Sequence, residues 1–338
     1  MTDPRTAWIE PGAFPVGAGV YRIPLPLPMD ALRAVNVYAI ADGEQVVLVD
    51  SGWAIAESEE LLVKALDGIG YGPDDVREFL VTHVHRDHYS QAIAIRRVYG
   101  SRVALGEHER PSLEAIREAI RTGTPPAHPE LIRAGAPSGL VRSDRGRVSA
   151  DEWELPDIWL HAGVTLPLRT RALRVVATPG HTRGHVVFYD EDAGALFAGD
   201  HVLPHITPSI GLETPYAQSP LRDYLDSLRL VRSLPDARLL PAHGPDAPSV
   251  HARVDELLDH HEQRLADTAK AVEQGASTAF EVAHVLRWTR RLRHFDELDR
   301  FNQVMATTET LAHLDVLVLR GWLTVTISDD GVGHYALT

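Results

Sequence analysis

The chain has 338 residues, with 33 Lys and Arg against 47 Asp and Glu, and its formal net charge of −14 argues against broad electrostatic binding to nucleic acid. It contains no cysteine, which excludes disulfide bonds and thiol nucleophiles. No apolar run approaches the roughly 20 residues of a membrane-spanning helix, and the N-terminus lacks a signal-peptide pattern, so we expect a cytoplasmic protein without membrane partners.

The first predicted elements are three strands and a helix. Apolar runs separated by Gly and Pro predict strands at residues 20–27, 36–41 and 45–50. Apolar residues at helical spacing then predict a helix over residues 54–66. A comparable series of strands and helices returns between residues 172 and 243. Two halves of this type favour two sheets packed face to face, with helices outside.

A dense group of ligand-type side chains follows the next predicted strand. Directly after the apolar run at residues 79–81, the segment 82–88 holds His83, His85, Asp87 and His88. Because side chains alternate along an extended chain, His83 and His85 can face one ion. If a helix begins at Asp87, its first turn places Asp87 and His88 beside a second ion. Zinc and similar divalent ions favour imidazole and carboxylate ligands, so this segment predicts a metal site.

Three later strand ends carry further residues of the same kind. His181 lies on a Pro/Gly turn after a predicted strand, Asp200 ends an apolar run, and His243 ends another. A single His or Asp in such a place is more often a capping or hydrogen-bonding residue. Four strand ends in one chain, each with ligand chemistry, favour one convergent site.

These separated motifs, in this order, resemble the metallo-β-lactamase-fold superfamily of hydrolases. The resemblance extends from about Asn36 to His243 and includes the strand-then-acid segment 46–52, in which Asp50 would lie behind the ligands near the metal floor. It implies an α/β protein with a four-layer αβ/βα sandwich. It also implies two divalent ions, one bound by His83, His85 and His181, the other by Asp87, His88 and His243, with Asp200 bridging them.

One departure from the family narrows the expected chemistry. Zinc β-lactamases of the best-known subclass carry a cysteine ligand, and this chain has no cysteine. An all-His/Asp set is more similar to the glyoxalase II, lactonase, thioesterase and ribonuclease branches, so antibiotic hydrolysis is not the first expectation. We expect zinc, with iron or manganese as the alternatives that such ligands accept.

A long segment, residues 107–168, separates the two halves and is expected to form a lid and part of the substrate pocket. It holds a predicted helix at residues 111–121, a turn-rich stretch at 123–126, and an apolar patch that includes Trp153 and Trp159. The two tryptophans are candidate substrate contacts. The alternative is that the segment packs on the sandwich as extra core.

Three more histidines lie close in sequence to the predicted ligands. His201 and His205 follow Asp200, and they could contact substrate or a developing oxyanion; the alternative is that they are satisfied loop histidines. His185 is expected, together with Asp50, to support the ligands from behind.

The C-terminal region, residues 250–338, is predicted to be a separate domain after a catalytic domain at residues 1–249. Its helices followed by a hairpin resemble the winged-helix appendage of one β-lactamase-like branch, which includes a ribonuclease. The helices are expected at about residues 254–265, 279–290 and 298–319, and the hairpin strands at 322–327 and 334–337.

The charge of this region does not favour nucleic acid as a partner. Residues 251–338 contain nine basic and fourteen acidic residues. Only Arg287, Arg290, Arg291 and Arg293 form a basic cluster, and such a cluster is more often a solvated face or an interface. We expect the region to close the pocket or to mediate self-association into a homo-oligomer.

The predicted site favours attack by a hydroxide held between two metal ions on an electrophilic carbonyl. Asp87 would orient the hydroxide and Asp200 would fix the distance between the ions. A thiolate leaves readily without protonation, and the apolar insertion favours an acyl or aromatic substrate, so an ester or thioester of a small molecule is the first expectation. A ribonuclease or phosphodiesterase, a lactonase, a single-iron oxygenase and a non-enzymatic binding module are the alternatives.

Overall fold

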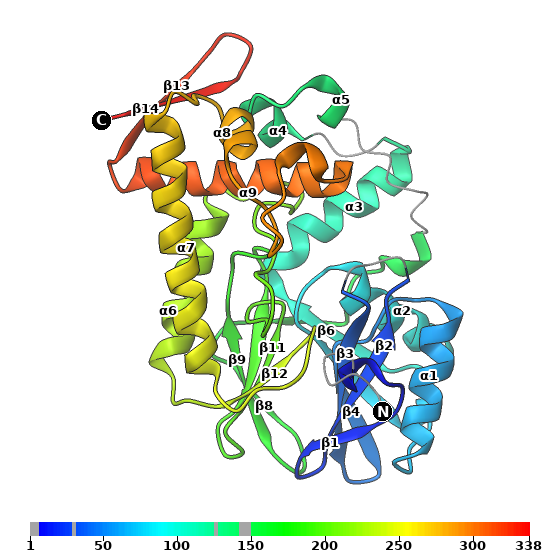
Figure 1. Cartoon of the computed structure of the whole chain (residues 1–338). Helices are drawn as coiled ribbons and strands as arrows, with labels where there is room; N and C mark the ends of the chain where they lie inside the picture. Colours follow the sequence, from blue (N-terminus) through cyan, green and yellow to red (C-terminus); the bar gives the residue numbers. More distant parts are fainter. Residues whose placement is uncertain (1–6, 29–31, 125–127, 142–149) are drawn as a thin grey trace.

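Two β-sheets lie face to face at the centre of the chain, whose computed structural model describes residues 7–28, 32–124, 128–141 and 150–338 (Figure 1). Among these residues the first sheet has seven strands, which lie in space in their chain order. They are β1 (Phe14–Gly17), β2 (Val20–Pro26), β3 (Ala34–Asp42), β4 (Gln45–Val49), β5 (Val76–Val81), β6 (Arg102–Gly106) and β7 (Ile158–Leu160). Pairing is antiparallel from β1 to β4 and parallel from β4 to β7.

The second sheet has five strands within the described part of the chain, in the order β12-β11-β10-β9-β8. They are β8 (Thr165–Pro167), β9 (Ala172–Ala177), β10 (Val186–Asp190), β11 (Ala195–Gly199) and β12 (Arg238–Pro241). β11 and β12 pair in parallel, whereas the other neighbours pair antiparallel. As a result, β9, β11 and β12 all run in the same direction.

Helices cover the outer face of each sheet, which gives four layers (Figure 1). The helices on the first sheet are α1 (Ala56–Asp67) and α2 (Arg86–Tyr99), and those on the second are α6 (Pro220–Ser233) and α7 (Val250–Glu273). α3 (Arg110–Thr122) lies beyond the end of the first sheet and contacts the 3-10 helices Glu107–Glu109 and Ala150–Glu152 (Figure 1). Each helix buries an apolar stripe and leaves its polar side exposed. The predicted αβ/βα sandwich is confirmed.

Alternation along the strands explains why both faces of the sheets are apolar. Leu80 of β5 packs between the two sheets with Val49 of β4 and Phe197 of β11. Its neighbours Phe79 and Val81 point the opposite way and pack under α1 and α2. Since successive side chains of a strand face opposite sides, one apolar run fills two cores. The end of β5 is thereby held firmly where the segment 82–88 begins.

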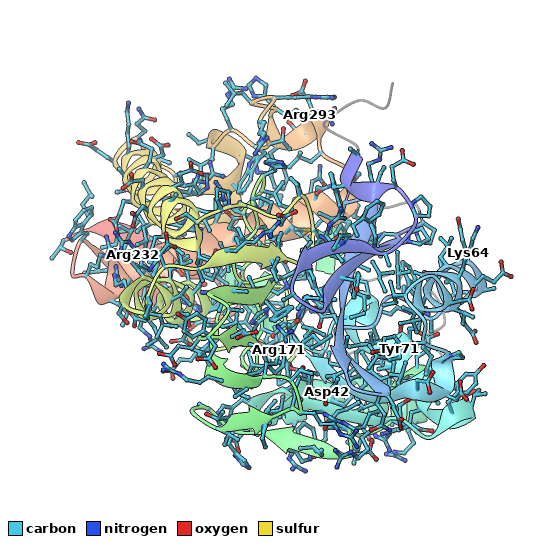
Figure 2. The ribbon with its side chains drawn as sticks, turned by 90° about the horizontal axis from the view of Figure 1, so that it is seen from below. Asp42, Lys64, Tyr71, Arg171, Arg232 and Arg293 are labelled. Carbon is cyan, nitrogen blue, oxygen red and sulfur yellow. The ribbon has the colours of Figure 1, made fainter. Side chains whose placement is uncertain are left out.

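Polar side chains tie the sheets together at the end of the sandwich that Figure 2 shows from below. Asp42, the last residue of β3, accepts hydrogen bonds from Thr170 N at 2.9 Å and from Arg77 Nη1 at 2.7 Å. Arg171 donates to the carbonyl of Ala18, which lies between β1 and β2. These contacts join the turn between β8 and β9 to the first sheet.

The shorter elements complete the described part of the fold. They include 3-10 helices at Ala7–Ile9, Pro73–Asp75, Glu107–Glu109, Ala150–Glu152 and Phe295–Glu297, the helices α4 (Pro129–Arg133), α5 (Ser138–Val141), α8 (Ala279–Val285) and α9 (Arg300–Leu319), and the hairpin strands β13 (Leu323–Ile327) and β14 (Gly333–Leu337). Within this described part, each helix is too short or too polar to cross a lipid bilayer.

The segment 107–168 is attached to the rest of the molecule at several places. Its strands β7 and β8 form edges of the two sheets, so sheet structure begins inside the predicted insertion. Glu152 accepts two hydrogen bonds from Arg86, at 2.5 and 2.7 Å, and α4 contacts α9. Part of the predicted turn at residues 123–126, namely Pro125 and Pro126, lies outside the described residues. Closure of this segment as a lid stays a prediction.

The C-terminal region contains the expected helices and hairpin, with one difference in length. The sequence predicts that the second helix reaches residue 290, but α8 ends at Val285 because Leu286 is extended and the following residues form a turn. In that turn Trp288 donates its indole N–H to the carbonyl of Ala283, and Thr289 has a positive φ of 63°. The resemblance to a winged helix and the domain boundary at residue 250 stay predictions.

Candidate metal centre

The predicted ligands lie at one edge of the two sheets. In the first sheet the segment 82–88 follows β5, which runs parallel to β4. In the second sheet His181, Asp200 and His243 follow β9, β11 and β12. Because strands that run in the same direction end at the same edge, residues far apart in sequence converge there. The structure brings all seven predicted ligands together in two adjoining groups.

The first group consists of His83, His85, His181 and Asp200, whose inward atoms lie within 4.8 Å of one another. The Nδ1 atom of His85 lies 3.0 Å from the Nε2 atoms of both His83 and His181. Asp200 Oδ2 lies 3.4 Å from His181 Nε2 and 3.9 Å from His83 Nε2. Ligand atoms around a tetrahedral ion with bonds of about 2.0 Å are separated by about 3.3 Å, so this spacing suits one ion.

The second group consists of Asp87, His88 and His243, on the other side of Asp200. Asp87 Oδ2 lies 3.4 Å from His88 Nε2 and 3.5 Å from His243 Nε2. Asp200 Oδ1 lies 3.7 Å from His88 Nε2 and 3.2 Å from His243 Nε2. The two oxygens of Asp200 thus face different groups, which is the geometry that a bridging carboxylate requires.

Hydrogen bonds to the protein fix the outer nitrogen of three of these imidazoles. The bonds run from His88 Nδ1 to Asp50 Oδ2 at 2.9 Å, from His181 Nδ1 to the carbonyl of Ser209 at 2.8 Å, and from His243 Nδ1 to the carbonyl of Ala34 at 2.8 Å. Because these oxygens accept hydrogen bonds, Nδ1 of each ring carries a proton, and in the neutral ring the lone pair of Nε2 faces inward. Proteins orient metal-binding imidazoles in this way.

Asp50 and Thr82 form a shared support behind the ligands. The Thr82 N–H and hydroxyl donate to Asp50 Oδ1 at 2.8 and 2.9 Å, which leaves the hydroxyl oxygen free to accept from His83 Nδ1 at 3.0 Å. Asp50 therefore holds His88 directly and His83 through Thr82. Its φ of 60° is uncommon outside glycine, so the backbone is strained at this point beside the site.

His185 supports Asp200 from the side of the second sheet. The Asp200 N–H donates to His185 Nε2 at 3.2 Å, and His185 Nδ1 donates to the hydroxyl of Thr178 at 2.8 Å. The preceding Gly199 has a φ of 51°, and a Cβ there would lie 2.7 Å from both His185 Nε2 and the Thr82 hydroxyl. Only glycine allows β11 to end so close to these side chains.

Three inward atoms are buried without a hydrogen-bond partner among the described residues: His88 Nε2, Asp200 Oδ1 and His243 Nε2. Buried polar atoms in proteins nearly always have a partner, and lone pairs that face one another repel. A bound divalent cation would supply the partner that these three atoms lack. The side chains therefore fit a metal, and the protein has a metal-binding His/Asp cluster. The metal, the number of ions and the role of each ligand stay predictions.

Burial and the neighbouring charges set the protonation of the cluster. Burial lowers the pKa of His83 well below its ordinary value and that of His85 to about 3, so both rings are neutral. Burial opposes ionisation of Asp200 and Asp87, but the surrounding imidazoles hold the pKa of Asp200 well below its usual range and that of Asp87 at about 2. Neutral imidazoles and ionised carboxylates are the forms that bind metal.

His88 differs from the other rings. Burial alone would lower its pKa, but Asp87, Asp50 and Asp200 together raise it well above the ordinary value. A proton and a metal ion therefore compete for the same inward nitrogen.

Two of the four predicted substrate contacts are buried. The ring of His201 is fully buried and lies 5.3 Å from the ring of Tyr224 on α6. Trp153 is 6% exposed and stacks on Tyr89 with ring centres 6.3 Å apart, in the core beneath α2. The burial of both rings argues against the predicted contacts with a substrate.

The other two predicted contacts are accessible. Trp159 is partly buried in β7, with the Arg110 guanidinium 4.3 Å from the centre of its ring. His205 is exposed and lies beside Gly244. The two are close enough that a Cβ added to Gly244 would be 3.8 Å from His205 Cδ2. Because Gly244 follows His243, His205 is next to the edge of the cluster. Contact of either side chain with a substrate stays a prediction.

Sequence reasoning missed several groups behind the ligands. Thr82 carries a usable signal, since a hydroxyl directly precedes the first ligand histidine. Ala34 and Ser209 act through backbone carbonyls, which every residue has, so no sequence pattern could identify them. Glu109 is fully buried and accepts a hydrogen bond from the Thr182 hydroxyl, and burial raises its pKa to about 8.

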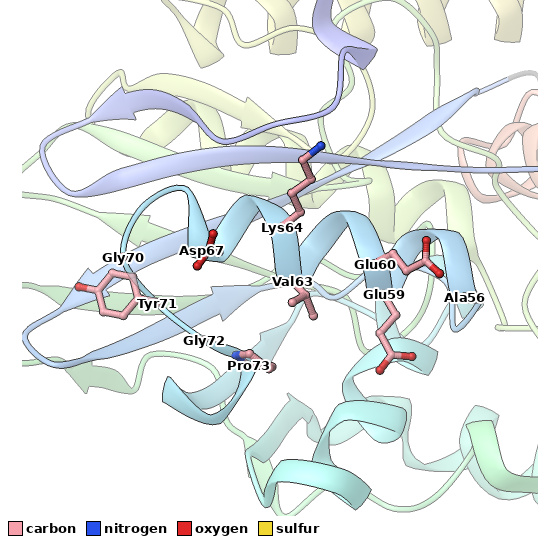
Figure 3. A pocket seen from close by; sticks show the side chains of 10 residues that line it. All are labelled: Ala56, Glu59, Glu60, Val63, Lys64, Asp67, Gly70, Tyr71, Gly72 and Pro73. Carbon is pink, nitrogen blue, oxygen red and sulfur yellow. The ribbon is translucent and has the colours of Figure 1, made fainter.

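A hollow of about 780 Å³ lies on the outer side of α1, away from these groups (Figure 3). Glu59, Glu60, Lys64 and Asp67 of α1 and Tyr71 of the following loop line it. The hollow contains none of the predicted site residues.

Comparison with known proteins supports these geometric findings. The sequence profile of the metallo-beta-lactamase superfamily matches residues 30–243. A Bacillus subtilis protein named "Probable metallo-hydrolase YqjP" is 26% identical over 308 residues, which cover 88% of this chain and 90% of the relative. The crystal structure of a beta-lactamase domain protein from Burkholderia ambifaria has a TM-score of 0.80 and 27% identity, and the match covers 96% of this chain and 94% of that one.

A more distant relative carries a named activity. An Aspergillus fumigatus protein named atrochrysone carboxyl ACP thioesterase is 25% identical over 249 residues, which cover 73% of this chain. The match spans 47% of that protein's length.

Proposed function

Because this chain belongs to the metallo-beta-lactamase superfamily, we propose that it is a dinuclear metal-dependent hydrolase that acts on a thioester or ester of an acyl or aromatic small molecule. The observation that carries the proposal is the placement of Asp200, whose two oxygens face two groups of inward lone pairs. The relative named as an ACP thioesterase supports the thioester.

The side chains of the cluster have separate tasks in this proposal. Divalent ions bound there would lower the pKa of water and polarise a carbonyl oxygen. Asp200, held by His185 through its backbone N–H, keeps the two groups at a fixed separation. Asp87 has a side chain that is 20% exposed, against 9% for Asp200, so its carboxylate can accept a hydrogen bond from an attacking water and orient it.

The orientation of the imidazoles favours a thioester over an oxygen ester or an amide. The ring protons on Nδ1 of His88, His181 and His243 point outward into hydrogen bonds, so the inward nitrogen of each ring can bind only one partner, a proton or a metal ion. With metal bound at these nitrogens, the three side chains would have no proton to give to a leaving group. Water gives up its two protons to the solvent and adds its oxygen to the acyl carbon, which becomes a carboxylate. The C–S bond breaks and its electron pair leaves with the sulfur as a thiolate, which a thiol pKa of about 8.5 allows. An alkoxide or amide anion would need a proton donor.

The test compares three substrates that share one acyl group. Protein loaded with zinc, manganese or iron is given the thioester, the oxygen ester and the amide, together with a phosphodiester and an RNA. We expect the thioester to react fastest and the amide not to react. If full metal loading gives no turnover of the thioester or the ester, or if only the phosphodiester or the RNA reacts, the proposal is wrong.

Two variants test the assigned side chains. His85→Ala and Asp87→Ala should each lower kcat by about 100-fold or more, with an unchanged circular dichroism spectrum. The control is His334→Ala, at an exposed histidine of the terminal hairpin, which should retain activity. Full activity of the Asp87 variant would contradict the proposed role.

A further inference from the structure

A groove of about 870 Å³ lies between α7, the segment 285–292 and residues 205–207. Sites for small molecules in proteins typically have volumes of roughly 300–1,000 Å³. The groove contains none of the seven predicted ligands. Its volume thus lies in the range of small-molecule sites, at a place apart from the predicted metal centre.

The groove is basic although the chain as a whole is acidic. Five basic side chains line it, against two carboxyl groups, in a protein with a net charge of −14. Arg264 lies with its guanidinium 4.1 Å from the centre of the Trp288 ring and donates to the carbonyl of Arg287 at 2.9 Å. In the described ranges, no carboxylate lies within ion-pair distance of Arg264, Lys270, Arg287 or Arg290. The four charges are available to an anion.

The two carboxyl groups do not outweigh the five basic side chains. Glu309 of α9 is partly buried, and burial raises its pKa despite the nearby Arg264. Asp267 accepts a hydrogen bond from Gln263 on its own helix. The lining also includes Val285 and Leu292, which are 51% and 68% exposed. A ligand that carries both an apolar arm and anionic groups complements this surface.

The loop after Asp200 connects the groove with the metal centre. Arg253 of α7 donates to the carbonyls of Leu203 and Ile206, at 2.6 and 2.9 Å, and so holds the loop from the side of the groove. Three residues further on, Ser209 accepts the hydrogen bond of His181 from the side of the metal centre. The two sites share this loop as a common wall.

His205 marks the point where the two sites meet. It lines the groove, and a Cβ on Gly244 would lie 3.8 Å from its ring. Because His243 directly precedes Gly244, a ligand in the groove can extend past His205 toward the metal centre.

We propose that this groove binds the phosphate groups of the thiol that carries the acyl group, as in a coenzyme A thioester. This inference rests on the proposed thioester hydrolysis, because a thioester has a thiol side that must be held apart from the reacting carbon. Guanidinium groups form strong, paired hydrogen bonds with phosphate oxygens. The volume suits one small molecule rather than a strand of nucleic acid.

Binding is tested on the metal-loaded full chain by isothermal titration calorimetry with coenzyme A, the free thiol product. In the double variant Arg287→Ala/Arg290→Ala we expect the Kd to rise about tenfold or more, because two guanidinium groups no longer bond to phosphate. The matched control is Arg291→Ala/Arg293→Ala, which removes the same charge from the same segment outside the groove lining. Arg293 lies at the outer edge of the molecule (Figure 2). The control should bind coenzyme A as the unmodified protein does.

Kinetics test the same claim with two substrates of one acyl group, the coenzyme A thioester and the N-acetylcysteamine thioester, which has no phosphate. The Arg287/Arg290 variant should raise KM about tenfold for the first and leave KM for the second unchanged, with kcat unchanged for both. Equal effects on both substrates, or equal effects of the control variant, would overturn the assignment.

The outcomes separate this inference from the proposed function. If no thioester is hydrolysed but coenzyme A binding depends on Arg287 and Arg290, the proposed function fails and the groove assignment holds. If the N-acetylcysteamine thioester is hydrolysed but coenzyme A does not bind, the groove assignment alone fails. Binding of single-stranded RNA through these two residues, without binding of coenzyme A, would also overturn it.

Discussion

Replacing Asp50 by Asn should weaken metal binding at the second group while leaving the first group nearly intact. Asp50 Oδ1 accepts from Thr82 N and the Thr82 hydroxyl, at 2.8 and 2.9 Å, and an amide oxygen can still do so. Asp50 Oδ2 accepts from His88 Nδ1 at 2.9 Å, and in the variant an NH₂ group takes its place. Two donors then face each other, so the His88 proton moves to Nε2 and removes the inward lone pair.

The size of the effect follows from the hydrogen bond between Asp50 and His88. Loss of a hydrogen-bonded partner behind a metal-binding histidine typically lowers metal affinity by about 10- to 100-fold, or about 1.4–2.7 kcal/mol. The fold should lose about 1.5–3 kcal/mol, since one hydrogen bond to a charged group disappears. The assay is a competition titration of apoprotein with a coloured chelator, fitted to two sites, with urea unfolding of the metal-free protein in parallel.

Asp42→Asn is the matched control for this experiment. Asp42 is as buried as Asp50 and also accepts bonds from a backbone N–H, a threonine hydroxyl and a third side chain, but at the opposite end of β3 from Ala34. This variant should lose stability by a similar amount and bind both metals normally. If Asp50→Asn binds both equivalents with unchanged affinity, or if Asp42→Asn weakens binding as much, the tautomer argument is refuted.

Three further variants or treatments give sharp expectations. Mainly because of burial, the pKa of Glu109 is raised to about 8, so this residue stabilises the fold most below about pH 4.5 and loses that contribution as the pH rises toward 8. Glu109→Gln should therefore remove a decline in the free energy of unfolding of about 1.4 kcal/mol per pH unit. Identical pH slopes of the variant and the unmodified protein in urea unfolding would contradict this expectation. Gly199→Ala should lower the free energy of unfolding by about 1–3 kcal/mol, because the added Cβ meets His185. The control Gly194→Ala should lower it less, since Gly194 has a similar φ of 58° but no atom within 4 Å of an added Cβ. Equal melting temperatures of the two variants would show that the close contact is unimportant. Removal of metal by a chelator should lower the melting temperature, and metal at 100 times its Kd should restore about 2.7 kcal/mol of the free energy of unfolding. A melting temperature that does not depend on metal concentration would contradict metal binding to the native state.

Local sequence determined the strands and the kind of chemistry at their ends. An apolar run such as 79–81 is a strand whose alternate residues fill the cores on its two sides, and this property depends only on neighbouring residues. The spacing of His83, His85, Asp87 and His88 likewise follows from one extended segment entering one helix. Those elements and the αβ/βα architecture could therefore be predicted.

The lengths and neighbours of other elements could not be read from the pattern. Sequence patterns do not predict the strand β10 and the helix α6 individually, because it is the packing of the second sheet that buries their apolar residues. The helix α8 stops at Val285 because Trp288 turns back to the carbonyl of Ala283, a contact that helical periodicity does not reveal.

Only the tertiary structure decided how each side chain is used. Trp153 and His201 resemble pocket residues in sequence, yet packing under α2 and against Tyr224 buries both rings. The carbonyls of Ala34 and Ser209 orient ligand histidines without any sequence signal. The donor nitrogens of the imidazoles, the orientation of the two Asp200 oxygens and the basic groove beside α7 arise from contacts between residues far apart in the chain. Such contacts exist only once the two sheets have packed together, so no local pattern can encode them.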